Sequence, residues 1–383
     1  MATTRSSKSK KPKVCLVLQG GGALGAYHIG AYQAMKEAGF EPDWFAGISI
    51  GALNSAILAG NEPENRLSQL ETFWNRISRP SSDVVIPSET AESYNTISAS
   101  QALLFGQPNF FTPRPVNPFF AFPGTEGAIS FYSTAPLFST MNDLCDFERI
   151  NTKKNRLILG ATRVTDGELI FFDNYKLPLG AEHPIASGSL PPGFPATRVG
   201  DEFYWDGGCV SNTPLDGILD VADENDDLLI FMVDLWNAHG DLPKTMNEVM
   251  WRQKEIQYAS RSSHNISAIV DRHNLHNLQK KLEVGSEAVP NATNLKEGGK
   301  IDIVHITYDA VQGHIPLSDT EFSRRSIEIR RNCGYEDMTK AIESSPWTKR
   351  ASTLNACVHR KDRTNGWDCG DKVTKITAKK KAS

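Results

Sequence analysis

Two strand–turn–helix units follow one another within the first 60 residues, and this pattern restricts the fold more than any other feature. Val14–Leu18 is a short apolar run rich in β-formers, and Gly20-Gly21-Gly22 and a helix-forming stretch over 23–38 follow it. Residues 44–48 form a second such run, which Ser49 and a helix of small residues follow. Consecutive units of this kind form parallel strands covered by helices. The chain is therefore expected to have an α/β fold with a mainly parallel central sheet.

Composition excludes several classes of protein without indicating a reaction. Hydrophobic residues are 39% and charged residues 22% of the 383 residues, an ordinary globular balance. A net charge of -4 disfavours a dedicated nucleic-acid binder. No apolar run reaches the roughly 18 residues of a membrane span, and the basic N-terminus lacks the apolar core of a signal peptide. These features predict a cytoplasmic protein, peripheral to a membrane at most, whose six scattered cysteines are reduced thiols.

Both ends of the chain are basic and polar. Residues 1–13 and 372–383 are rich in lysine, which is typical of solvated, disordered tails. The alternative is a transient contact with a membrane surface, since clustered lysines are attracted to anionic lipids. Oligomeric state is left open by the sequence.

The region between the tails divides into a main domain, an insertion and an extension. We expect the main α/β domain to span residues 14–240 and a helical extension, with one late strand at 302–308, to pack on it over residues 241–371. Residues 80–132 are rich in Ser, Pro, Asn and Phe and are expected to be an irregular insertion. Its rings form either a lid or acyl-chain wall, or simply pin a loop to the core. Six phenylalanines cluster there: Phe105, Phe110, Phe111, Phe119, Phe120 and Phe122.

Gly47-Ile48-Ser49-Ile50-Gly51 matches the pattern G-x-S-x-G between a strand and a helix. A nucleophilic serine has to sit on a sharp, strained turn with its hydroxyl exposed at the carboxyl edge of the sheet. Gly47 and Gly51 remove side chains that would clash there, and the following helix directs its positive end at a developing oxyanion. The simpler alternative is a tight turn whose Ser49 only caps the helix.

Gln19-Gly20-Gly21-Gly22-Ala23-Leu24-Gly25 lies between the first strand and its helix. Consecutive glycines let backbone N–H groups converge on one anion, which would be an oxyanion or a pyrophosphate. Gly20, Gly22 and Gly25 also match the dinucleotide fingerprint, so a nucleotide-binding module or oxidoreductase is an alternative. That fingerprint expects an acidic residue after the second strand, whereas Asp43 precedes it. Acyl transfer therefore fits the pattern better.

Asp206-Gly207-Gly208 follows the predicted strand Phe203–Trp205. An aspartate followed by two glycines places a carboxylate on a loop that neighbouring backbone can approach closely. By itself the motif would indicate a β-turn. Next to a serine nucleophile, Asp206 is the candidate base.

In this order, the glycine-rich nest, G-x-S-x-G and D-G-G resemble the patatin-like phospholipase family. The resemblance covers residues 14–235 apart from the insertion, and Asn212 and Pro214 after the aspartate also look like the family's. It implies a three-layer α/β/α fold and a serine acyl hydrolase that works with a Ser–Asp dyad. By position, Ser49 matches the nucleophile and Asp206 the base. The oxyanion loop matches Gly20, Gly21 and Gly22.

One position departs from the family pattern. Many members carry Arg or Lys in the glycine-rich loop, where this chain has Ala23-Leu24. The oxyanion donors are backbone N–H groups, so this departure affects tuning more than activity. The segment after residue 240 resembles an extension found in some bacterial members, and no chemistry is assigned to it.

The expected reaction is hydrolysis of lipid or other acyl esters, by a phospholipase or esterase of lipid degradation. Asp206 takes the proton of the Ser49 hydroxyl, Ser49 attacks the carbonyl, and the glycine nest and the Ile50 N–H stabilise the oxyanion. Water then hydrolyses the acyl-enzyme. No cofactor, metal or nucleic acid is expected, and the partner is the acyl-ester substrate.

Two alternatives involve other residues or no reaction. In a Ser–His–Asp triad the histidine would follow the nucleophile in the chain. His305 lies in an apolar strand and is more simply a hydrogen-bonded core residue, while His273 and His276 share a helix face without a third metal ligand. A catalytically silent relative that only binds lipid is the other alternative. The histidines considered for a triad are His183, His239, His264 and His305.

Overall fold

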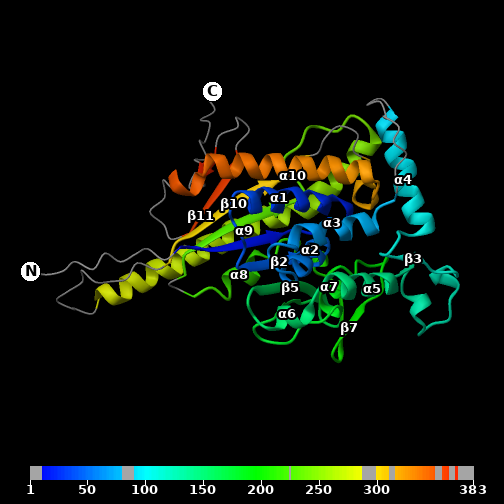
Figure 1. Ribbon diagram of the computed structural model, residues 1–383, viewed down its shortest axis with the longest axis horizontal. Coiled ribbons are helices and arrows are strands. Elements are labelled where there is room, and N and C mark those ends of the chain that lie inside the picture. Colours follow the sequence, from blue (N-terminus) through cyan, green and yellow to red (C-terminus); the bar gives the residue numbers. More distant parts are fainter. Residues whose placement is uncertain are drawn as a thin grey trace, which may run out of the picture.

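In the computed structural model, a ten-stranded mixed sheet forms the centre of the molecule (Figure 1). The structure describes residues 11–79, 90–223, 226–286, 299–309, 315–349, 356–361 and 367–369. The strand order is β12-β11-β10-β9-β1-β2-β5-β8-β7, and β6 pairs with β5. The strands that run parallel are β1 (Lys13–Leu18), β2 (Trp44–Ile48), β5 (Arg156–Arg163), β9 (Leu228–Asp234), β10 (Ile301–Thr307) and β11 (Ala356–Lys361). The antiparallel strands are β6 (Leu169–Asp173), β7 (Thr197–Val199), β8 (Glu202–Asp206) and β12 (Trp367–Cys369).

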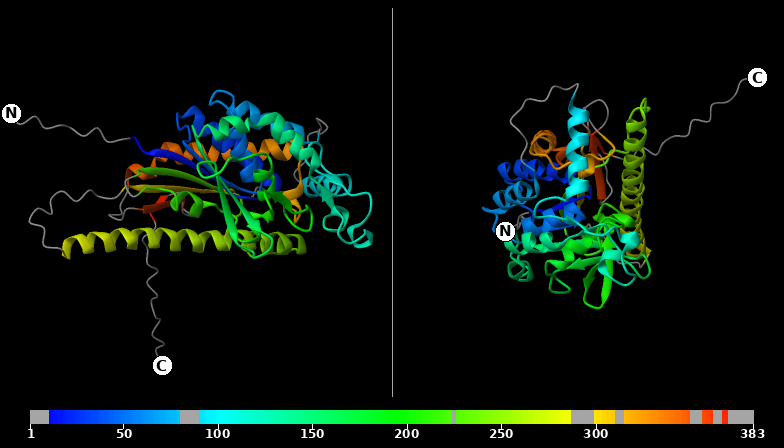
Figure 2. Two further views of the ribbon diagram at one scale, coloured as in Figure 1. Left: turned by 90° about the horizontal axis from the view of Figure 1, so that it is seen from below. Right: turned by 90° about the vertical axis from the view of Figure 1, so that its right-hand side faces the viewer.

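Helices cover both faces of this sheet, which confirms the expected α/β/α layers (Figure 2). Along β1, Leu16 and Leu18 belong to one apolar cluster, and Cys15 and Val17 to the other, because successive side chains point to opposite faces. The first face is covered by α1 (Tyr27–Glu37), α2 (Ile50–Ala59), α3 (Arg66–Ile77), α5 (Ala135–Leu144), α6 (Phe147–Asn151), α7 (Glu182–Ser187) and α10 (Arg324–Ser344). The second face is covered by α8 (Leu215–Leu219) and the long α9 (Met246–Ser286).

The C-terminal region is part of the central sheet as well as a helical layer. β10 pairs with β9 along its whole length, as the late apolar run indicates, and β11 and β12 extend the sheet further. Helix α10 crosses α1 at two glycines: a Cβ on Gly30 would lie 1.8 Å from the carbonyl oxygen of Arg331, and one on Gly334 would lie 2.0 Å from that of Tyr27. The segment expected as a helical extension is thus continuous with the main domain.

The insertion is more regular than its composition indicates. Helix α4 (Ala91–Phe105) occupies its first half, and the short strands β3 (Thr112–Pro113) and β4 (Tyr132–Ser133) pair near its end. Its phenylalanines divide into two groups, since Phe110 and Phe111 are buried whereas the others are exposed. Residues 80–89 of the insertion lie outside the described residues, as do residues 1–10 and 372–383 of the basic tails. The exposed phenylalanines are Phe105, Phe119, Phe120 and Phe122.

Two further expectations from composition have different outcomes. Cys357 is disulfide-bonded, so the prediction of six reduced thiols is wrong at that position. The scattered spacing of the six cysteines gives no sign of this bond. Within the described ranges, no helix has both the length and the apolar character needed to cross a membrane.

Candidate active site

Ser49 lies on the predicted sharp turn between β2 and α2. Its backbone has φ 56° and ψ -127°, a left-handed conformation that is costly for a residue with a side chain. The Ser49 N–H holds this turn by donating to the carbonyl and the hydroxyl oxygens of Ser187, at 3.1 and 3.0 Å. A Cβ on Gly51 would lie 2.2 Å from the carbonyl oxygen of Leu18, which explains the glycine. Gly47 is equally confined, with Gly51 O 2.3 Å from its Cβ position.

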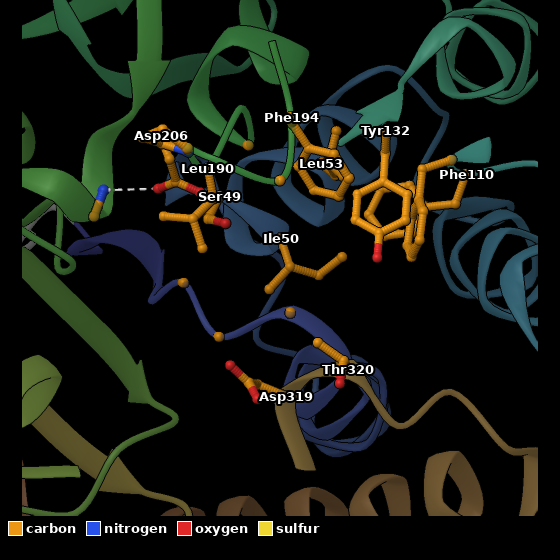
Figure 3. Close-up of a pocket in the computed structure, with 18 of the residues that line it drawn as sticks. Ser49, Ile50, Leu53, Phe110, Tyr132, Leu190, Phe194, Asp206, Asp319 and Thr320 are labelled. Carbon is orange, nitrogen blue, oxygen red and sulfur yellow. Dashed lines mark hydrogen bonds between the residues drawn. The ribbon is translucent and has the colours of Figure 1, made fainter. Parts of the chain in front are cut away.

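Asp206 ends β8 and is buried beside Ser49 (Figure 3). Its carboxylate accepts a hydrogen bond from the Gly208 N–H at 2.7 Å, and the Ser49 side chain lies next to it (Figure 3). Burial raises the pKa of Asp206 to about 6, although the interactions with the Ser49 hydroxyl and the Gly208 N–H lower it. Gly207 leaves room for β5, because its Cβ would lie 2.6 Å from the carbonyl oxygen of Gly160. The carboxylate is therefore a stronger base than an exposed aspartate and lies beside the hydroxyl that a base has to deprotonate (Figure 3).

The glycine nest at the end of β1 lies directly against Ser49. A Cβ on Gly20 would be 2.8 Å from the Cβ of Ser49, so only glycine permits this approach. The Gly20 N–H itself donates to the carbonyl oxygen of Asn212 at 3.3 Å and is not free for an oxyanion. No described residue accepts a hydrogen bond from the N–H groups of Gly21 or Ile50. Of the four predicted donors, Gly21, Gly22 and Ile50 remain as candidates.

Two side chains fix the orientation of the peptide between Gly20 and Gly21. The Gly20 carbonyl oxygen accepts hydrogen bonds from Asn212 Nδ2 at 2.8 Å and from Trp236 Nε1 at 2.9 Å. A trans peptide directs its C=O and its N–H to opposite sides, so these bonds turn the Gly21 N–H away from Asn212. Gln19 holds Trp236 in turn, because its Oε1 accepts from the Trp236 N–H at 3.2 Å.

A cavity of about 250 Å³ extends from Ser49 and Asp206 between apolar side chains (Figure 3). Ser49, Asp206 and the nest form one end, and aromatic rings lie further along it. Among the apolar side chains that line it are Leu53, Leu103, Phe110, Phe111, Tyr132, Leu190, Phe194 and Phe322.

Part of this cavity comes from the C-terminal region, to which the sequence assigned no chemistry. Tyr258 of α9 and Asp319, Thr320 and Phe322 before α10 line it. The carbonyl oxygen of Asp319 lies so close to Gly22 that a Cβ there would be 2.3 Å away. Lys254 holds Asp319 in place through an ion pair of 2.8 Å. No local motif marks these residues, whereas Trp236 could have been found from its place at the carboxyl end of β9.

The structure gives little support to the two alternatives, a histidine triad and a dinucleotide-binding module. Within the described part of the chain, no histidine lines the cavity. His305 is bonded to Asp234 at 2.9 Å and is buried, as the core interpretation predicts. Asp43 accepts from the Val14 N–H at 2.9 Å, at the start of β1, so it lies at the edge of the sheet opposite the nest. The dinucleotide fingerprint therefore lacks its acidic residue.

In the described ranges, one group of residues brings potential metal-ligand atoms close together: Asp302, Cys357 and His359. Cys357 is in a disulfide and offers no thiolate. His359 Nε2 is hydrogen-bonded to Asp302 at 2.7 Å, which satisfies both without an ion. The group does not fit a metal site.

Comparison with known proteins found similar sequences and similar structures. Over 61 residues, the sequence is 43% identical to the neuropathy target esterase sws of Drosophila melanogaster, a match of 16% of this chain and 4% of that protein. The chain thus spans a small fraction of the curated relatives that it matches. Human GIVD cytosolic phospholipase A2 is similar in structure, with a TM-score of 0.44 and 11% identity over 88% of this chain and 59% of that chain. For VipD from Legionella pneumophila the TM-score is 0.42 and the identity 14%, over 88% and 67% of the two chains.

Family models cover both halves of the molecule. The model described as patatin-like phospholipase matches residues 16–219, which include the nest, Ser49 and Asp206. A second model, described as patatin phospholipase, matches residues 256–354, which include the cavity residues before α10. The chain belongs to the patatin-like phospholipase family, whose members are typically carboxylic ester hydrolases.

Proposed function

We propose that this protein is a serine hydrolase that cleaves lipid or other acyl esters through an acyl-enzyme on Ser49, with Asp206 as the base. The observation that carries the proposal is the position of the Ser49 side chain next to the buried carboxylate of Asp206, beside the glycine nest and at the end of an apolar cavity (Figure 3). A structural turn would need neither the strained φ of Ser49 nor the buried charge of Asp206.

The reaction begins with proton transfer. Asp206, with its pKa raised to about 6, accepts the hydroxyl proton as the Ser49 oxygen bonds to the ester carbonyl carbon. The carbonyl oxygen becomes an oxyanion that accepts from the N–H groups of Gly21, Gly22 and Ile50. Ile50 begins α2, whose N-terminal partial positive charge adds to this stabilisation.

The second half of the reaction reverses the roles. The carbon–oxygen bond to the leaving alcohol breaks, and the protonated Asp206 returns its proton to that alcohol. A water molecule then gives a proton to Asp206 and attacks the acyl carbon. The bond from that carbon to the Ser49 oxygen breaks, Asp206 returns the proton to this oxygen, and the acid leaves. The same carboxylate serves both steps, so no histidine is required.

The apolar wall favours a fatty acyl chain as the bound part of the substrate. Most of the side chains that line the cavity away from Ser49 and the nest are aliphatic or aromatic, and such walls bind apolar chains with few orienting polar groups. The polar part of the ester would lie at the end formed by Ser49, Asp206 and the nest. We therefore propose lipid esters as the natural substrate class, without a preference for a headgroup.

Hydrolysis of p-nitrophenyl butyrate and palmitate by the wild-type chain and by Ser49→Ala tests the proposal. We expect hydrolysis by the wild-type chain and its loss in Ser49→Ala. Ser139→Ala is the matched control, because Ser139 is an exposed serine of α5 outside the cavity. Equal turnover by the Ser49 variant, with the same far-UV circular dichroism, would refute the proposal.

A further inference from the structure

The tip of the insertion presents three phenylalanine rings to solvent. Phe119, Phe120 and Phe122 are 83%, 84% and 84% exposed, more than the other phenylalanines of the described chain. Figure 2 shows this segment, in cyan, projecting at one end of the molecule. Large apolar side chains that are gathered and exposed usually mark a surface that is covered in use.

Hydrogen bonds hold the tip in the shape that exposes these rings. The side chain of Asn117 accepts from the Phe119 N–H at 3.1 Å, and its carbonyl accepts from the Phe120 N–H at 2.9 Å. The hydroxyl of Thr125 donates to the carbonyl oxygen of Phe122 at 2.7 Å. The rings are therefore displayed by an ordered turn with its own caps.

Charged residues are rare around the tip. Between residues 93 and 132 the sequence has only Arg114 and Glu126, although charged residues make up 22% of the chain. These two form an ion pair with each other, at 3.7 Å. Nearby on α4, Leu104 and Phe105 are 68% and 69% exposed. An uncharged surface rich in phenylalanine matches hydrocarbon better than water or a charged protein surface.

The same segment forms part of the wall of the acyl cavity. Leu103 of α4 precedes the exposed Leu104, while Phe110, Phe111 and Tyr132 line the cavity on either side of the tip in the sequence. Tyr132 is tied to α4 by a hydrogen bond from its hydroxyl to the carbonyl oxygen of Leu103, at 2.7 Å. One short segment thus joins the exposed rings to the substrate cavity.

We propose that Phe119, Phe120 and Phe122 insert into a lipid surface and bring the cavity to its substrate. This inference rests on the proposed lipid substrate but concerns a different part of the molecule. The sequence offers the lysine-rich tails as the alternative membrane contact, and residues 1–10 and 372–383 of these tails lie outside the described residues. The tip works by apolar insertion, so it predicts binding to uncharged lipid that salt does not weaken, whereas lysines would require anionic lipid and low salt.

Flotation with phosphatidylcholine vesicles in high salt tests the proposal, and Ser49→Ala keeps the lipid intact during the measurement. The triple variant Phe119→Ser, Phe120→Ser, Phe122→Ser should bind these vesicles about 1,000-fold more weakly or worse, since burying each of the three rings is worth about tenfold or more. Phe203→Ser is the matched control, because this ring of β8 is 48% exposed and lies outside the tip. It should bind as the parent does.

The same triple change in the active chain separates the tip from the reaction. Hydrolysis of monomeric p-nitrophenyl butyrate should be unchanged, while hydrolysis of vesicle lipid should fall with binding. Binding to vesicles that survives the triple change overturns the proposal. Light scattering that finds a dimer only in the parent, with unaltered vesicle binding, overturns it in favour of a second copy of the chain. Ring-dependent binding by a parent without esterase activity would uphold the tip and refute only the proposed function.

Discussion

The two ends of the cavity are built in different ways. At the reacting end, Ser49 and the nest follow strands β2 and β1, Asp206 ends β8, and backbone hydrogen bonds fix each of them. The wall at the other end comes from the insertion, from the loop around Phe194 and from Phe322 of the C-terminal region. The reacting end therefore depends on backbone geometry, whereas the wall depends on side-chain size. Substitutions at the first should change rate, and substitutions at the second should change substrate preference.

Removal of the base, Asp206, should reduce kcat/KM more than any other change apart from removal of the nucleophile, Ser49. Asp206→Asn keeps the shape and the bond from Gly208 but cannot take a proton, so kcat/KM for p-nitrophenyl butyrate should fall by about 10²- to 10⁴-fold. Asp201→Asn is the control, because the Asp201 side chain is fully exposed in the preceding turn. A loss below about fivefold would show that another group is the base.

Unfolding measurements at pH 7 separate this loss from damage to the fold. Burial raises the pKa of Asp206 from 3.8 to about 6, so the folded chain holds the proton more tightly than the unfolded chain. The ionised carboxylate therefore weakens the fold above about pH 6, and this cost is absent at pH below the unfolded value. Urea unfolding of Asp206→Asn at pH 7 should show a stability no lower than that of the parent.

A change that loosens the peptide between Gly20 and Gly21 should cause the next largest loss of activity. Asn212→Ala removes the bond to the Gly20 carbonyl and leaves only that from Trp236, so the Gly21 N–H is less well directed. We expect kcat to fall about 10- to 100-fold with little change in KM, because the bond acts on the oxyanion. A change confined to KM would contradict this role. Asn61→Ala, which removes a side-chain amide that bonds to the carbonyl of Leu144 instead, is the control.

The pH profile should follow the ionisation of Asp206. With a pKa of about 6, kcat/KM should be constant above about pH 7 and should fall with decreasing pH, to about a tenth at pH 5. The fall is expected because protonation removes the base. A profile that falls only near pH 4 would indicate an ordinary exposed carboxyl group as the base.

Substitutions in the apolar wall should have the smallest effect on activity, and they should change substrate preference instead of the rate. Leu103→Trp fills part of the cavity, so the ratio of palmitate to butyrate hydrolysis should fall about tenfold while butyrate hydrolysis stays similar. Leu104→Trp is the matched control, because the Leu104 side chain, next to Leu103 in the sequence, is 68% exposed and does not line the cavity. Equal losses for both esters would mean that the two ends do not act separately.

The difference between the reacting end and the wall also explains which parts of the site could be predicted from the sequence. Ser49, Asp206 and the nest carry local motifs because each has to make a tight backbone turn, and parallel strands bring their carboxyl ends to one edge. Gly20 was predicted as an oxyanion donor, but its N–H is occupied by Asn212, a contact between residues far apart in the chain. Asp319 and Phe322 carry no such signal, since only the packing of α10 on α1 brings them to the cavity.

The insertion shows most clearly what could not be predicted from the sequence. Its phenylalanines look alike in the sequence, yet Phe110 and Phe111 form the wall whereas Phe119 and Phe120 face solvent. Helix α4 was missed because its serines, threonine and asparagine mask a helical period. Which side a ring faces is decided by the caps of the turn and by β3 and β4, and neither follows from composition.

Covalent labelling with an alkyl fluorophosphonate tests the central claim most directly. Intact mass and peptide mapping of the labelled wild-type chain should show one phosphonyl group per chain, attached to Ser49. The label should be absent from Ser49→Ala, present in Ser139→Ala, and slow to form in Asp206→Asn. A folded wild-type chain that is labelled on another serine, or not at all, would contradict the account.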